Sequence, residues 1–130
     1  MSGWFWRWAP VVAQMCAIFY LSGQSDVPSL PGGLSSYTGH MIGYALLGGL
    51  ALRAWAGATW RGVTATAALK AVLLASAYGV TDEVHQSFVD NRFPGVDDWV
   101  ADTAGAILGV LAIMGLARLR RSRESRGRDV

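Results

Sequence analysis

The sequence predicts an all-α protein, a bundle of four transmembrane helices with both termini in the cytoplasm. Three observations support this fold class. The 130 residues are 52% hydrophobic and only 15% charged, whereas soluble domains usually carry about 25% charged residues. Four apolar runs follow one another, each close to the length of about 20 residues that a spanning helix needs. No alternating strand pattern competes with them, and helices satisfy the backbone hydrogen bonds that a bilayer cannot.

The first predicted span comprises residues 4–21 and begins with an aromatic cluster of Trp4, Trp6 and Trp8. Tryptophan is enriched at membrane–water interfaces, so this cluster indicates where the helix meets the membrane surface. A secretory signal peptide has a similar apolar core, but no cleavage site of small residues follows this run. We therefore expect an uncleaved first helix.

Three further spans are predicted, at residues 37–56, 63–81 and 99–116. Two of them contain Gly-x-x-x-Gly pairs, which allow membrane helices to approach closely: Gly39 with Gly43, and Gly105 with Gly109. A soluble helical bundle is the alternative, but four long apolar runs joined by short loops favour the membrane fold. The spans make one membrane domain, residues 1–117, and we expect the basic segment 118–130 to be a disordered cytoplasmic tail.

The distribution of lysine and arginine predicts the orientation of the bundle. Short cytoplasmic loops carry an excess of these residues. The loop between the second and third spans is bracketed by Arg53, Arg61 and Lys70, and six of the eleven basic residues follow position 117. The first loop has no basic residue and the third has one. Both termini are therefore predicted to be cytoplasmic, and the first and third loops to be external.

The composition also disfavours several kinds of function. Because the basic residues concentrate in the tail, the net charge of +2 does not indicate a face that binds nucleic acid. Cys16 is the only cysteine, which excludes an intrachain disulfide and a metal site built from cysteines. The sequence contains no phosphate-binding loop, no nucleophile elbow and no zinc-protease motif.

Residues 81–106 hold six of the nine acidic residues, although apolar runs flank this stretch. The predicted topology brings the polar residues of the stretch to the outer membrane level, where the second span also begins. A polar site near the boundary of the outer leaflet is therefore predicted. Its candidate residues are His40, Tyr44, Asp82, Glu83, His85, Gln86, Arg92, Asp98 and Asp102.

Charged groups inside the membrane boundary are costly, so we expect Asp82 and Asp102 to face the bundle interior with polar partners. Three uses of the site stay open at this stage. Asp82, His85 and Asp102 could bind a divalent metal such as zinc or manganese. An acid paired with His85 could instead perform general acid–base chemistry on a lipid-linked substrate. The third use is a buried polar network that locks the helices together, with Asp98 serving as a helix N-terminal charge and Arg92 as a loop ion pair.

Several segments resemble the VanZ-like family of small bacterial integral membrane proteins. The resemblance covers roughly residues 18–110, with departures at Gly23 and Gly39, and is carried by "LSGQS" (21–25), "GHMIGYALLG" (39–48), "YGVTDEVHQSF" (78–88), "NR" (91–92) and "DDWVADTAGAILG" (97–109). It implies a multi-pass protein of the bacterial cytoplasmic membrane that acts at the outer face. The member that gives the family its name is associated with low-level resistance to the glycopeptide antibiotic teicoplanin, so the resemblance also implies a resistance theme.

These inferences predict a protein that engages or modifies an envelope component, either a lipid-linked wall precursor or a lipid headgroup. In an enzymatic version, Asp82 or Glu83 is the base, His85 the proton shuttle and Asp102 a further catalytic group. The substrate-binding residues are then His40, Tyr44, Gln86, Arg92 and Asp98, with Arg92 holding an anionic phosphate. The alternative is a non-catalytic membrane module that binds a lipid, an antibiotic or a partner protein. The sequence leaves open the substrate, the metal requirement and the oligomeric state.

Overall fold

The computed structural model describes residues 3–26, 31–33 and 35–128. Four α-helices make up most of this part of the chain: α1 (Gly3–Ser22), α2 (Ser36–Trp55), α3 (Ala65–Gln86) and α4 (Val96–Arg126). A short 3-10 helix, η1 (Pro31–Gly33), lies between α1 and α2. The described residues contain no β-strand. The all-α prediction is therefore confirmed for them.

The local sequence explains where α3 and α4 begin and how the chain turns between them. Thr64 precedes α3, and its Oγ1 accepts a hydrogen bond of 3.2 Å from the backbone N–H of Ala67, as expected of an N-cap. Asp97 and Asp98 occupy the first turn of α4, where negative charge is favoured by the helix dipole. Asn91 adopts a positive φ of 61° between these helices, a conformation that asparagine tolerates better than most residues. The chain therefore reverses direction between α3 and α4.

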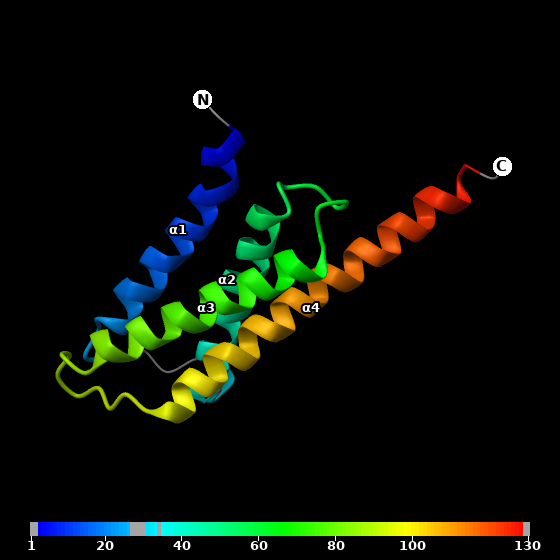
Figure 1. The fold of residues 1–130 in the computed structure, drawn as a ribbon. Coiled ribbons are helices and arrows are strands. Elements are labelled where there is room, and N and C mark those ends of the chain that lie inside the picture. Colours follow the sequence, from blue (N-terminus) through cyan, green and yellow to red (C-terminus); the bar gives the residue numbers. More distant parts are fainter. Residues whose placement is uncertain (1–2, 27–30, 34, 129–130) are drawn as a thin grey trace.

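The four helices run up and down, so that their connections gather at two opposite ends (Figure 1). The end where α1 and α3 finish and α2 and α4 begin is called the polar end, and the end with the α2–α3 loop, the start of α1 and the last turns of α4 is called the basic end. Helix α2 packs against all three other helices, most extensively against α4. Helix α1 contacts α2 and α3 but does not contact α4.

Glycine allows α2 and α4 to approach until their backbones touch. A Cβ atom on Gly105 would lie 2.3 Å from the carbonyl oxygen of Met41, and one on Gly109 would lie 2.0 Å from that of Ala45. The close approach predicted at these two glycines is therefore present. On α2, however, the residue involved is Gly48, because a Cβ on Gly43 would meet nothing within 4 Å.

We expect Gly109→Ala to lower the thermal stability of the protein in detergent, because the added methyl group overlaps the α2 backbone. The matched control is Gly115→Ala on the same helix, where a Cβ would meet nothing within 4 Å. Alanine favours a helix by up to about 1 kcal/mol over glycine, so the control should keep or raise the melting temperature. Equal melting temperatures for the two variants would contradict the close packing.

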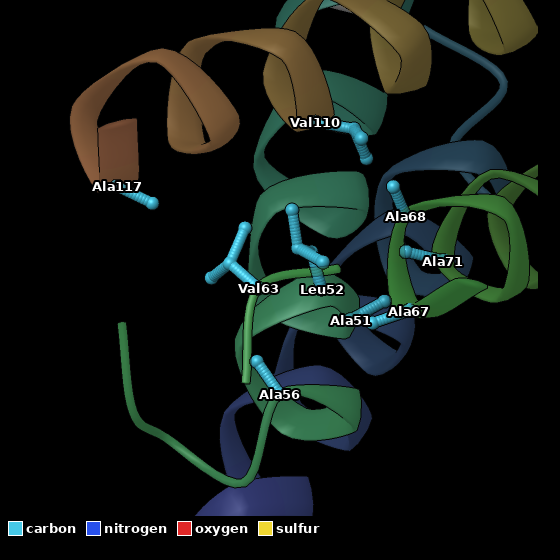
Figure 2. Packing of buried hydrophobic residues seen from close by; sticks show 9 residues of the cluster. All are labelled: Ala51, Leu52, Ala56, Val63, Ala67, Ala68, Ala71, Val110 and Ala117. Carbon is cyan, nitrogen blue, oxygen red and sulfur yellow. The ribbon is translucent and has the colours of Figure 1, made fainter. Parts of the chain in front are cut away.

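Small side chains fill the space between the helices toward the basic end (Figure 2). Alanine dominates this core, which permits the short distances between helix axes that membrane bundles favour. Its buried members are Ala51, Leu52, Ala56, Val63, Ala67, Ala68, Ala71, Val110 and Ala117. A second apolar cluster, which includes Val11, Tyr44, Leu47 and Ala106, also joins several helices. Most large apolar side chains are therefore left for the outer surface.

Within the described residues, α4 is the one helix whose length and mean hydropathy suffice to cross a membrane. The predicted spans 4–21, 37–56 and 63–81 coincide with helices, but charged or polar residues inside these helices lower their mean hydropathy, among them Arg7 in α1, His40 and Arg53 in α2, and Lys70 in α3. Helix α4 also continues through the basic segment as far as Arg126, where the sequence predicted a disordered tail. Leucine, arginine and glutamate there favour a helix, which explains the difference. Residues 129–130 lie outside the described residues.

Candidate functional site

Polar side chains from all four helices meet at the polar end of the bundle. Helix α1 contributes its last residue, α2 its first turns, α3 its last turns and α4 its first turns. The group is called the polar cluster and consists of Ser22, His40, Tyr44, Asp82, Glu83, Gln86, Asp98 and Asp102. Seven of the nine site residues predicted from the sequence belong to it, so the predicted convergence of these seven is present.

His40 lies between two carboxylates of α4. Its Nδ1 is 2.8 Å from Oδ1 of Asp102, and its Nε2 is 3.9 Å from Oδ1 of Asp98. The two acids are four residues apart and so project from neighbouring turns on one face of the helix. Asp102 is fully buried, whereas His40 is partly exposed. The pair therefore joins a buried carboxylate to an imidazole that solvent can reach.

Asp82 connects three helices through hydrogen bonds. Its Oδ1 accepts a hydrogen bond from the hydroxyl of Ser22 at the end of α1. Its Oδ2 accepts from the hydroxyl of Tyr44 on α2 at 3.4 Å and from Nε2 of Gln86 on α3 at 3.3 Å. All four side chains are buried. Both carboxylate oxygens of Asp82 are therefore partnered, which is the arrangement that a buried charge requires.

Glu83 follows Asp82 and faces the start of α4. Its Oε2 accepts a hydrogen bond of 2.9 Å from the backbone N–H of Gly95, while its buried Oε1 has no hydrogen-bond partner among the described residues. Glu83 lies beyond the predicted third span. Burial raises the pKa of its carboxyl, and the charges of Asp98 and Asp102 act in the same direction, whereas the Gly95 N–H opposes them. A proton is therefore held more tightly here than on an exposed glutamate.

Two predicted site residues, His85 and Arg92, make no hydrogen bond or ion pair with the polar cluster among the described residues. The ring of His85 stacks on Phe19 of α1, with centroids 3.9 Å apart and planes at 9°. Arg92 lies between α3 and α4, and its Nε is buried without a hydrogen-bond partner in the described part of the chain. No described carboxylate forms an ion pair with Arg92. Ser22 belongs to the cluster although it was absent from the predicted set, and its position at the end of the first apolar run was the available signal.

The sequence predicted that any metal would be held by Asp82, His85 and Asp102. The residues that the structure brings together are instead His40, Asp82, Glu83 and Asp102, each of which offers a ligand atom within 4.8 Å of the others. His85 is absent from this group because its ring faces α1. The catalytic and binding roles assigned from the sequence stay predictions.

An open groove of about 440 Å³ lies beside the polar cluster, between the end of α3 and the start of α4. Its walls are mainly apolar and include Val80, Val84, Val96 and Trp99. Glu83 lines the groove as well, so the apolar groove and the polar cluster share a residue. Such an arrangement fits a ligand with an apolar part and a polar part.

A family model described as VanZ/LLP1 matches residues 34–118. The matched stretch contains α2, α3 and most of α4, and it includes every residue of the polar cluster except Ser22. No curated protein and no solved structure matches the chain.

Proposed function

The chain belongs to the VanZ/LLP1 family, and on this premise we propose that it is a multi-pass membrane protein that binds a lipid-linked envelope component at its polar cluster. The apolar groove that shares Glu83 with the cluster carries this proposal. The membrane, the orientation and the ligand are supported by separate observations.

The outer surface of the bundle supports insertion of all four helices. Large apolar side chains are exposed on every helix, and in water so much exposed apolar surface would favour aggregation. In a bilayer the same side chains contact lipid tails. Examples are Phe19 and Leu21 on α1, Ile42 and Leu46 on α2, Leu69 and Leu73 on α3, and Leu108 and Leu111 on α4. Four membrane-spanning helices would also place both termini on one side, in agreement with the start of α1 and the end of α4, which lie at the basic end.

The distribution of charge supports an outward-facing site. At the basic end, Lys70 lies 5.0 Å from the ring centre of Trp55, and Arg120 lies 5.1 Å from that of Trp60. Arg53 donates a hydrogen bond of 3.2 Å to the carbonyl oxygen of Trp6. Cations and tryptophans together are typical of a cytoplasmic membrane interface. The acid-rich polar end then faces the opposite side, which in a bacterium is the outer surface of the inner membrane.

The proposed ligand is amphipathic, with its hydrocarbon chain in the groove and its headgroup at the polar cluster. Val80, Val84 and Trp99 offer apolar contacts to the chain. Arg92 forms no ion pair with a described carboxylate, so its guanidinium is available to an anionic phosphate. A lipid-linked wall precursor combines these features, and so does the headgroup region of a membrane lipid. The link to glycopeptide resistance belongs to this proposal, because glycopeptides act on wall precursors.

The His40–Asp102 pair supports a version of this function in which the bound component is modified. A carboxylate bonded to one ring nitrogen orients the imidazole and stabilises its protonated form, which is what a general acid–base requires. The hydrogen bonds around Asp82 favour the other candidate, a non-catalytic module held rigid by a polar lock. The two assignments concern different residues and can be tested separately.

We expect Val84→Trp to weaken binding of a polyisoprenyl phosphate by about tenfold or more, because the larger side chain fills part of the groove. Binding is measured on the purified protein in lipid nanodiscs by native mass spectrometry. The matched control is Leu69→Trp, at another exposed position of α3 that does not line the groove. Equal affinities for the wild type and Val84→Trp would show that the lipid does not bind in the groove.

A further inference from the structure

The geometry points to a divalent metal site in which His40, Asp82, Glu83 and Asp102 are the protein ligands. One potential ligand atom from each residue lies within 4.8 Å of the others. The residues come from α2, α3 and α4, and two of the four side chains are buried. Ligands held by helices keep their relative positions, which favours a preformed site.

Unpartnered oxygen atoms give independent support to the site. Asp102 is fully buried, and its Oδ2 has no hydrogen-bond partner among the described residues. Oε1 of Glu83 is also buried and unpartnered in this part of the chain. A buried carboxylate oxygen without a donor is costly, so such atoms call for an explanation. Coordination of a cation by both atoms provides one.

The charge of the site leads to the same conclusion. Four carboxylates, those of Asp82, Glu83, Asp98 and Asp102, gather around one imidazole. No lysine or arginine pairs with any of them among the described residues. Buried charges are normally paired or coordinate a metal. A divalent cation would neutralise the excess, and each of these carboxylates keeps at least one lone pair that no hydrogen bond uses among the described residues.

The ligand types indicate the class of metal. Imidazole suits transition metals such as zinc, and carboxylates suit harder ions such as manganese and magnesium, so one histidine with three carboxylates fits Mn²⁺ or Zn²⁺. No thiolate ligand belongs to the proposed site, since the single cysteine, Cys16, is exposed on α1. The inference goes beyond the proposed function and does not depend on the lipid ligand. A cation would nevertheless bring positive charge to an acidic cluster that is expected to meet a phosphate.

The test uses the full-length protein in detergent, treated with a chelator and then titrated with Mn²⁺ alone. Free Mn²⁺ is followed by electron paramagnetic resonance, and Zn²⁺ is added as a competitor. We expect saturable binding of one Mn²⁺ per chain, displaced by Zn²⁺. Asp102→Asn and Glu83→Gln should each weaken binding by about tenfold or more. Asp97→Asn makes the same charge change as Asp102→Asn at an exposed position of α4, and its affinity should equal that of the wild type.

Folding is checked by size-exclusion chromatography and thermal melts. If Asp102→Asn misfolds, the Mn²⁺ affinity of Glu83→Gln is used instead, because Glu83 is partly exposed and its substitution disturbs folding less. Absence of saturable binding by the wild type at about 1 mM Mn²⁺ or Zn²⁺ would overturn the inference. Equal weakening by Asp97→Asn would do the same, because it would show non-specific attraction to acidic groups. No lipid is added, so the metal titration is independent of the test of lipid binding. Failure of polyisoprenyl phosphate to bind would overturn the proposed function alone, and absence of Mn²⁺ binding would overturn the metal site alone.

Discussion

Asp82→Asn is expected to cause severe loss of folded protein. The substitution preserves shape but replaces one acceptor oxygen with an NH₂ group, which would meet donors instead of acceptors. Asp82 accepts hydrogen bonds from Ser22, Tyr44 and Gln86, and thereby links α1 and α2 to α3. Hydrogen bonds to a charged group contribute about 1.5–3 kcal/mol each, so the loss should reach several kcal/mol, against a typical total stability of about 5–15 kcal/mol.

The measurement is the amount of monodisperse protein recovered from membranes, together with its melting temperature. Asp90→Asn is the control, because Asp90 is an acid in the α3–α4 connection, outside the polar cluster, and the substitution makes the same change of charge. Recovery of Asp82→Asn at the level of Asp90→Asn would show that the network around Asp82 does not lock the bundle.

Asp102→Asn should act differently. The asparagine introduced there can still accept a hydrogen bond from His40 through its side-chain oxygen, and the carboxylate oxygen that is lost has no partner among the described residues. We therefore expect levels in the membrane closer to the wild type than those of Asp82→Asn, with loss of the cellular function. Under the proposed link to glycopeptide resistance, that function is measured as teicoplanin susceptibility of a bacterium expressing each variant at matched levels. Equally low levels for both variants would favour a purely structural network.

The convergence of the polar cluster was predictable because it depends on pattern alone. His40, Asp82 and Asp102 stand near the ends of apolar runs, and an up-and-down bundle must bring those ends together. The cost of burying a charge further predicted that Asp82 and Asp102 would find partners. Both do, although through different residues: Asp82 through three hydrogen bonds and Asp102 through His40.

The choice between the two histidines could not be predicted, because it depends on the neighbours of each helix face. Successive residues of a helix are rotated by about 100°, so Glu83 and His85 lie on opposite flanks of Asp82. The Glu83 flank faces Gly95 at the start of α4, and the His85 flank faces Phe19 on α1. Which helix lies on which flank is a property of the packing. The same reason explains why Gly48, and not Gly43, contacts α4.

The orientation prediction has an all-or-none outcome. In a background with Cys16→Ser, we expect Asn91→Cys to react with a membrane-impermeant maleimide in intact bacterial cells. Thr59→Cys, in the α2–α3 loop, should react only after the inner membrane is permeabilised. Both positions are exposed in the structure, so folding of the protein does not hide either one. The physical basis is the concentration of Arg53, Arg61 and Lys70 around the α2–α3 loop.

This pair of positions also separates four spans from one. If α4 alone crossed the membrane, everything before it would lie on a single side, and Thr59→Cys and Asn91→Cys would react alike. With four spans, α3 separates the two positions, and their reactivities must differ. If only Thr59→Cys were labelled in intact cells, the bundle would have the opposite orientation to the one predicted. The polar cluster would then face the cytoplasm, away from wall precursors at the outer surface. An outward-facing site for such a ligand therefore requires Asn91→Cys to react and Thr59→Cys to be protected.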